Sequence, residues 1–268
     1  MNSSQKTGPA DIFLRMVRRM DFYRRRGFAM PTDRATDRNA FEDDAREAVY
    51  QAIFSRRDVR RHFIRDAIDD AVLARLLLAA HHAPSVGYMQ PWNFVVIRDA
   101  ARRQKVRDLF VAARQQELPL MAGDRRALYR KLKLEGICES ALNLCVTCDR
   151  KRSEGSPLGR SHNPEMELFS TVCAVQNFWL AARAEGIGVG WVSIFDTPAL
   201  KALLEMPDHV VPVAYLCVGK VSEFAPRPDL EDRGWGSRLP LAGLIMSEVF
   251  GGEGEASLKE AVAAATPE

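Results

Sequence analysis

Residues 164–185 form the most apolar helical pattern in the chain, and this segment constrains the fold more than any other. The apolar side chains recur at helical spacing, at Val172, Val175, Trp179 and Ala182, and the pattern ends at Gly186. A helix that is apolar on several sides must be buried. The segment therefore predicts a central helix packed on several sides within a large core.

Strand patterns lie on both sides of this helix. Residues 92–97 and 142–148 are predicted strands before it, and residues 190–195 and 210–218 are predicted strands after it. The remaining helical patterns are a stripe over 48–53, a helix capped by Asp69 that stops before Pro84, charged helices over 100–134, and a short helix near Pro198. This order predicts one mixed α+β domain in which helices flank a central sheet of about four strands.

The two ends of the chain differ from this globular pattern. Residues 1–42 carry nine Lys and Arg against five Asp and Glu, and we expect an N-terminal extension that is disordered or forms a short basic helix. Residues 43–250 form the predicted domain, and residues 251–268 are a predicted flexible tail.

Charge and cysteine content exclude several classes of protein. With 38 Lys and Arg, 35 Asp and Glu and a net charge of +3, the chain has no overall field for nucleic acid. Prolines interrupt the longest uncharged run, so we expect no membrane span. Arginines interrupt every candidate secretion signal, and five cysteines without a regular framework are typical of free thiols. These features predict a cytoplasmic protein.

The common motifs for nucleotides, metals and acyl transfer are absent from the sequence. No Gly-x-Gly-x-x-Gly precedes a helix, and neither a Walker loop nor a Gly-x-Ser-x-Gly elbow occurs. Cys145 and Cys148 lack a second pair at zinc-site spacing and are predicted packing thiols. The five histidines have no metal spacing either, so we predict no metal site.

Three segments are harder to explain by folding alone. The run 56–60 (Arg-Arg-Asp-Val-Arg) offers guanidinium groups, whose geometry suits a phosphate, although a solvated charge run is the alternative. The loop 83–92 offers Ser and Gln side chains between prolines, and the alternative is an ordinary loop. The segment 188–194 offers glycines that let the backbone approach a ring, and the alternative is the ordinary start of a strand. Together they predict a pocket for a phosphorylated planar cofactor, which indicates FMN.

These residues resemble the FMN-dependent nitroreductase superfamily, in which an arginine cluster binds the phosphate and a Pro-Ser-x-x-Asn-x-Gln-Pro-Trp loop borders the flavin. The loop is matched here by Pro84, Ser85, Gln90, Pro91 and Trp92. Tyr88 stands where nitroreductases commonly have Asn, and it would close the space over the flavin. The flavin itself would then be the substrate.

With this departure, the motifs at 56–60, 133–137, 158–164 and 191–195 resemble the 5,6-dimethylbenzimidazole synthases, the flavin-destroying branch of the superfamily. The resemblance spans roughly residues 45–245. It implies a nitroreductase-like dimeric fold and an oxidoreductase that fragments reduced FMN with O2. The products would be erythrose 4-phosphate and 5,6-dimethylbenzimidazole, the lower ligand of cobalamin (vitamin B12).

The resemblance also implies the residues of the site. Asp58 and Ser193 match the family's catalytic pair. The expected flavin-binding residues are Arg56, Arg57, Arg60, Ser85, Gln90, Leu134 and Arg238. The expected partners are a second copy of the chain and a separate flavin reductase that uses NAD(P)H to supply reduced FMN.

Three alternatives stay open at this point. One is a conventional FMN-dependent nitroreductase or flavin reductase that uses NAD(P)H. Another is a reductase of cob(II)yrinic acid a,c-diamide, and the third is a flavin-binding module without enzymatic activity. Product analysis separates them.

Overall fold

The computed structural model describes residues 40–152, 155 and 158–265. The predicted N-terminal extension lies almost wholly outside the described residues. Within them, four strands form one sheet with the order β1-β2-β4-β3. The strands are β1 (Trp92–Ile97), β2 (Leu142–Asp149), β3 (Ile187–Val192) and β4 (Val210–Lys220). Every neighbouring pair is antiparallel. The predicted four-stranded sheet is confirmed.

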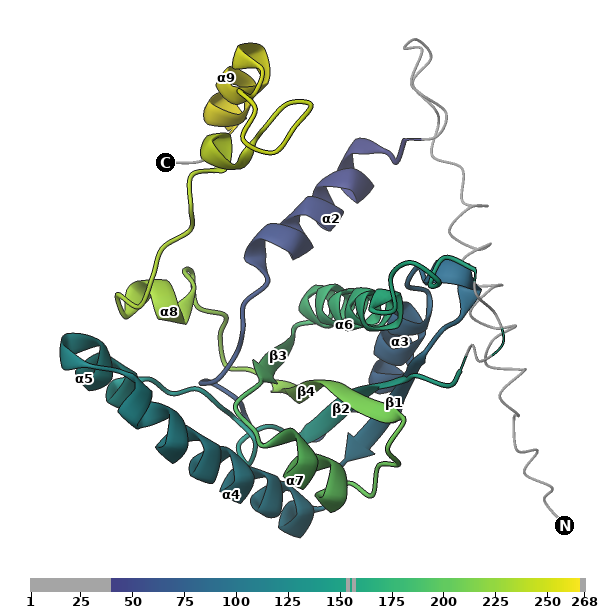
Figure 1. The fold of residues 1–268 in the computed structure, drawn as a ribbon. Coiled ribbons are helices and arrows are strands. Elements are labelled where there is room, and N and C mark those ends of the chain that lie inside the picture. The colour runs from purple at the N-terminus through teal and green to yellow at the C-terminus, as the bar shows by residue number, and fades with distance from the viewer. Residues whose placement is uncertain (1–39, 153–154, 156–157, 266–268) are drawn as a thin grey trace, which may run out of the picture. The chain divides into compact units, whose positions relative to one another are not determined.

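Helices cover both faces of this sheet (Figure 1). One face carries α3 (Asp70–His81) and α6 (Met166–Ala184), which pack on each other. The opposite face carries α4 (Ala100–Glu117) and α7 (Thr197–Leu203). Between α4 and β2 lie the short helix η2 (Leu118–Leu120) and α5 (Gly123–Lys131). The prediction of helices over 100–134 is confirmed.

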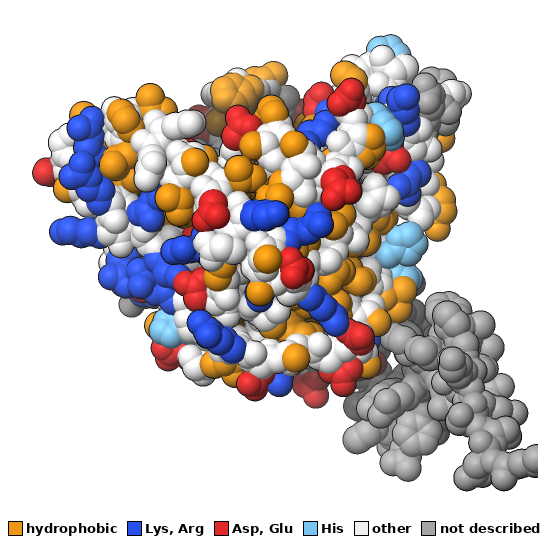
Figure 2. All heavy atoms as spheres, turned by 90° about the horizontal axis from the view of Figure 1, so that it is seen from below, with side chains coloured by type: hydrophobic (Ala, Val, Ile, Leu, Met, Phe, Trp, Pro, Cys, Tyr) orange, Lys and Arg blue, Asp and Glu red, His pale blue; other side chains and the backbone are white. Residues whose placement is uncertain are grey.

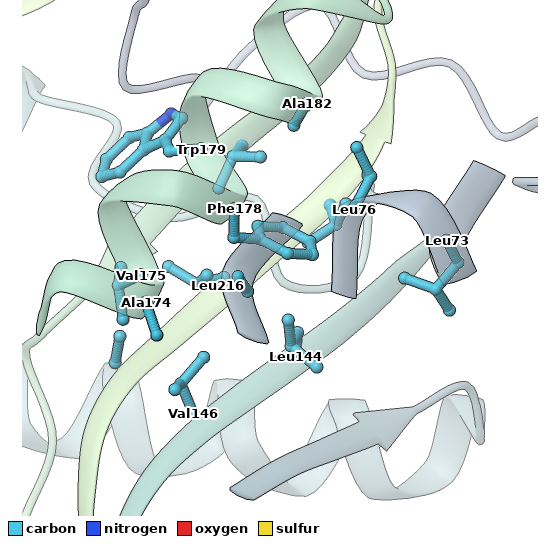
Figure 3. Close-up of a cluster of buried hydrophobic side chains, with 14 of the residues drawn as sticks. Leu73, Leu76, Leu144, Val146, Ala174, Val175, Phe178, Trp179, Ala182 and Leu216 are labelled. Carbon is cyan, nitrogen blue, oxygen red and sulfur yellow. The ribbon is translucent and has the colours of Figure 1, made fainter. Parts of the chain in front are cut away.

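The core on the α3 and α6 face is shown in Figure 3. Apolar side chains from two helices and two strands meet there, including Leu76 from α3, Phe178 from α6, Leu144 from β2 and Leu216 from β4, all with no measurable exposure. The buried positions of α6 recur every three or four residues along one stripe. Val172 lies off that stripe and is exposed, but α6 packs on α3 and on the strands β2, β3 and β4, so the prediction of packing on several sides is confirmed.

A second core lies under α4 and α7 and explains the Cys-x-x-Cys sequence. Cys145 belongs to this core, whereas Cys148 lies near Thr171 of α6, on the other face. Residues three apart on a strand point to opposite faces, so the two thiols cannot share a metal or form a disulfide. Burial raises the pKa of Cys145 to about 12. The prediction of packing thiols is confirmed, and all five cysteines are free.

Strand β3 begins earlier than its sequence pattern suggests. Residues 190–195 were the expected range, but the strand starts at Ile187, directly after Gly186, which has a φ of 72°. Glycines are poor strand formers, which hid the start of the strand. Gly188 and Gly190 lie inside it, where their missing side chains admit Val59 and Val221. The predicted bounds are therefore wrong, and these glycines accommodate protein rather than a ring.

The elements outside these layers expose much apolar surface. Helix α2 (Asp43–Ser55) has no residue buried by the described part of the chain. After β4 follow α8 (Asp229–Asp232), η3 (Leu241–Leu244) and α9 (Ala256–Ala265), and α9 packs on η3. The segment 251–268, predicted as a flexible tail, thus contains a helix in its described part. No helix among the described residues has the length and apolar character needed to cross a bilayer.

Candidate functional site

The segment that carries Asp58 lies against the edge strand β3. Asp58 forms an isolated parallel bridge with Val189, and the Val59 amide donates to the Val189 carbonyl at 2.9 Å. This close approach requires a glycine beside it, because a methyl group at position 190 would overlap the carbonyl oxygen of Val59. The position of Asp58 therefore depends on Gly190.

The Asp58 carboxylate is held at both oxygens. Its Oδ1 accepts a hydrogen bond of 2.9 Å from the Trp191 amide, and its Oδ2 pairs with Arg60 Nη2 at 2.5 Å. The Arg60 side chain is only 13% exposed, and its Nε and Nη1 atoms have no hydrogen-bond partner among the described residues. Buried N–H groups without partners are costly, so Arg60 fits an anionic or oxygen-rich ligand beside Asp58.

A cluster of guanidinium groups lies next to Asp58. The pKa of Arg57 is lowered, first by burial and then by the positive charges of Arg56, Arg183 and Arg238, in decreasing order, while Glu231 opposes the shift. Arg56 also stacks over Trp179, 4.7 Å from the ring centroid. A phosphate would offset the repulsion among these cations, so the residues present fit the phosphate end of FMN.

Arg57 itself is largely occupied by the protein backbone. Its Nε donates to the Ala225 carbonyl at 3.1 Å, one Nη donates to Phe54 and to Arg56 at 2.8 Å each, and the other Nη donates to Pro226 at 2.5 Å. Four of its five N–H groups are thus used. Arg57 joins the end of α2 to the segment after β4, and one N–H is left for the predicted phosphate contact.

Ser193 and Leu134 lie close to the same edge of the sheet. Ser193 follows the last residue of β3 and is exposed. It is two residues beyond Trp191, about 7 Å along an extended chain. Leu134 packs against the second core, which contains Val192. Asp58, Ser193 and the arginines 56, 57 and 60 therefore lie along the β3 edge of the sheet, and Leu134 packs against the core that contains the last residue of this strand.

Ser85 and Gln90 lie elsewhere in the chain, near the start of α6. The Ser85 hydroxyl accepts from the Gln90 amide at 3.1 Å, and the neighbouring Val86 amide donates to Ser170 Oγ at 3.2 Å. Arg57, by contrast, lies near Trp179, whose indole N–H donates to the Arg57 carbonyl. Nine residues of helix separate Ser170 from Trp179, about 13 Å along the axis. The single chain does not bring this loop to Asp58.

The same loop presents Tyr88 to the outside. Tyr88 is 84% exposed and has a positive φ of 54°, as do Gly87 and Gln90, with values of 60° and 46°. Left-handed conformations at non-glycine residues are strained and need support. Within one chain Tyr88 lies away from Asp58, so its predicted position over the flavin stays a prediction.

Two site residues were missed from the sequence. Arg183 is part of the guanidinium cluster and donates from Nε to the Ser55 carbonyl at 3.1 Å. Its position in the last turn of an otherwise apolar helix was the available signal. Trp191 contributes its backbone amide, which no side-chain pattern can reveal. In the parts of the chain with described coordinates, no three His, Cys, Asp or Glu side chains form a metal-binding group.

The fold and this site define a protein of a known class. The model of the nitroreductase family matches residues 53–220. Because this match covers more than half of the sequence, the chain belongs to the nitroreductase family, whose members are enzymes of the oxidoreductase type.

Two curated relatives are more specific. The chain is 45% identical over 197 residues to the 5,6-dimethylbenzimidazole synthase of Rhodospirillum rubrum, which covers 74% of this chain and 92% of the relative. It is 41% identical over 201 residues to the enzyme of the same name from Rhodobacter capsulatus, covering 75% and 96%.

A solved structure supports the fold. Iodotyrosine deiodinase, solved with FMN and 3-iodo-L-tyrosine bound, superposes with a TM-score of 0.56 at 20% identity. The match covers 67% of this chain and 92% of that protein. The likeness shows a shared nitroreductase fold.

Proposed function

We propose that the chain is a 5,6-dimethylbenzimidazole synthase, which fragments reduced FMN with O2 to 5,6-dimethylbenzimidazole, erythrose 4-phosphate and an oxidised four-carbon pyrimidine from the rest of the ring system. The observation that carries the proposal is the Asp58 carboxylate, fixed by Trp191 and Arg60 beside a cluster of guanidinium groups. The similarity to two curated synthases supports the choice of this reaction over nitroreduction. Reduced FMN supplies both the electrons for O2 and the carbon skeleton of the product.

Asp58 is the proposed proton acceptor. Its Oδ2 faces Arg60, and a ligand anion that engages the free N–H groups of Arg60 would weaken that ion pair. Oδ2 could then take a proton from the ribityl chain, while the Trp191 amide keeps Oδ1 in place. Oδ1 thus holds the carboxylate in position, and Oδ2 is the proposed proton acceptor.

The guanidinium cluster is the proposed phosphate end. Arg56, Arg183 and Arg238 lie around Arg57, and the one N–H group that Arg57 has left would also donate to the phosphate. Ser193 is the proposed hydrogen-bond donor to the ring system, because it extends from β3 just beyond the residue that binds Asp58. Leu134 would pack against the flavin.

A homodimer with the flavin at its interface is part of the proposal. Helix α2 exposes Tyr50 and Phe54, and the segment after β4 exposes Leu239, Val249 and Phe250, the last at 96%. Such apolar surface marks an interaction site. A second copy would also explain how Ser85 and Gln90 bind flavin although they lie far from Asp58 in their own chain. In a dimer, these two residues of one chain would reach the flavin that is held at Asp58 of the other chain.

A separate flavin reductase that uses NAD(P)H is the proposed source of reduced FMN. The test is an aerobic incubation of the protein with chemically reduced FMN, followed by chromatography for 5,6-dimethylbenzimidazole. We expect the benzimidazole to appear and FMN to disappear. If FMN were recovered intact, while added NAD(P)H reduced a nitroaromatic or a corrinoid substrate, the proposed function would be wrong and one of the reductase alternatives would replace it.

A further inference from the structure

A cavity lies on the α4 face of the sheet. It has a volume of about 260 Å³ and lies between one side of α4, the end of α5 and the segment that follows α5. This cavity shares none of its lining residues with the Asp58 site, although its Glu135 directly follows Leu134 in the sequence. Nothing in the proposed reaction uses it.

The cavity has an apolar side of defined shape. Its accessible apolar surface comes mainly from Val111, which is exposed, and the half-buried Leu118, while Phe110 and Tyr129 line it as almost fully buried side chains. Tyr129 is fixed because its hydroxyl donates to Glu117 at 2.5 Å. The volume is below the roughly 300–1,000 Å³ of sites for drug-sized ligands, so the occupant would have one or two rings.

The polar lining is strongly positive. Three guanidinium groups, those of Arg107, Arg114 and Arg130, line the cavity with one carboxylate, Glu135. Glu135 is already engaged, since it accepts from the Ile137 amide at 2.7 Å and lies 3.6 Å from Arg107. The side chains that line the cavity therefore carry a net charge of +2, and the nearby carboxylate of Glu117, which accepts from Tyr129, offsets part of it.

The arginines differ in how far the protein uses them. One Nη of Arg114 donates to the carbonyls of Tyr129, Arg130 and Leu132, so this side chain joins α4 to the end of α5. The Arg130 guanidinium forms no hydrogen bond or ion pair within the described chain. Figure 2 shows Lys and Arg side chains gathered on the left of the molecule, the side where Figure 1 places α5. This field attracts anions to the mouth of the cavity.

We propose that this cavity binds a small aromatic anion that carries one phosphate or carboxylate group. The ring would lie against Val111 and Leu118, next to the nearly buried Phe110 and Tyr129, and the anionic group would meet Arg130 and Arg107. An anion there offsets the repulsion among the guanidinium groups, and the apolar wall excludes a bare inorganic ion as the preferred occupant.

The test is calorimetric titration of the full chain, with the flavin site filled by excess FMN. The probes are 1-naphthyl phosphate, 1-naphthoate and the neutral 1-naphthol. We expect one of the two anions to bind and 1-naphthol to bind at least tenfold more weakly, and the comparison of the anions tells which group the cavity prefers. Equal binding of 1-naphthol, or no anion binding with a Kd below about 1 mM, would overturn the proposal.

Matched variants locate the site. Arg130→Gln should weaken anion binding about tenfold or more, whereas Lys131→Gln, which removes the same charge from the next residue of α5, should change it less than twofold. Val111→Trp fills the cavity and should abolish binding without touching any charge. Equal losses in the two charge variants, or parental binding in Val111→Trp, would place the anion elsewhere and refute the assignment.

Discussion

Gly190→Ala should detach the Asp58 segment from β3. The added methyl group would overlap the Val59 carbonyl, which is backbone and cannot rotate away. Two hydrogen bonds flank the overlap: Val59 to Val189, worth about 1 kcal/mol, and Trp191 to the Asp58 carboxylate, worth about 1.5–3 kcal/mol. Alanine recovers about 0.5–1 kcal/mol through the smaller backbone entropy loss on folding. The net loss in free energy of unfolding is about 1.5–3.5 kcal/mol.

Urea unfolding followed by circular dichroism, at one fixed protein concentration, measures this loss. Gly188→Ala is the matched control, because its methyl group would meet only side-chain carbons of Val221 and Val59. We expect the control to lie within about 1 kcal/mol of the parent, at the low end of overpacking costs, and to keep flavin turnover. If Gly190→Ala were as stable and as active as Gly188→Ala, the inferred dependence of Asp58 on Gly190 would be refuted.

Three further substitutions or conditions test separate parts of the account. Asp58→Asn should bind reduced FMN but lower benzimidazole formation roughly 100-fold, with FMN returned intact in the chromatogram; parental product yield would remove the proton-acceptor role. Arg238→Ala should weaken FMN binding about tenfold and riboflavin binding little, as measured by flavin fluorescence; equal losses would exclude a phosphate contact. Burial raises the pKa of Cys145 from 9.0 to about 12. As the pH rises above 9, the Cys145 thiol therefore loses its proton in the unfolded protein before it does so in the folded protein. The free energy of unfolding should therefore fall by up to about 1.4 kcal/mol per pH unit between pH 9 and 12 from this group, and Cys145→Ala should flatten that slope in urea titrations.

Much of the fold could be predicted because its helices and strands follow simple periodic patterns. Asp69 caps α3 by accepting from the Ala71 amide, as its position before an apolar stripe indicates. Strand β3 was the exception, since Gly188 and Gly190 weaken the strand pattern and act through the space that they leave. Close backbone approach is a tertiary property that no local pattern contains.

The candidate site was only partly predictable for a similar reason. The run 56–60 predicted a phosphate-binding cluster, but the sequence could not show how its arginines differ. Arg57 mainly binds backbone carbonyls, whereas Arg60 pairs with Asp58 and keeps N–H groups without a partner among the described residues. Arg183 joins the cluster from α6, more than 120 residues along the chain, through contacts made only in the folded protein. Tyr88 is exposed within one chain, so the prediction that it covers the flavin depends on a second copy, which the sequence of one chain cannot place.

The most direct test of the account is a mass balance over a single turnover. Protein in excess over chemically reduced FMN is mixed with air-saturated buffer, and FMN, 5,6-dimethylbenzimidazole and erythrose 4-phosphate are quantified by liquid chromatography and mass spectrometry. The account predicts that the benzimidazole and the sugar phosphate form in equal amounts at the expense of FMN, and that Asp58→Asn returns the FMN. Quantitative recovery of oxidised FMN from the parent protein, with neither product, would contradict it.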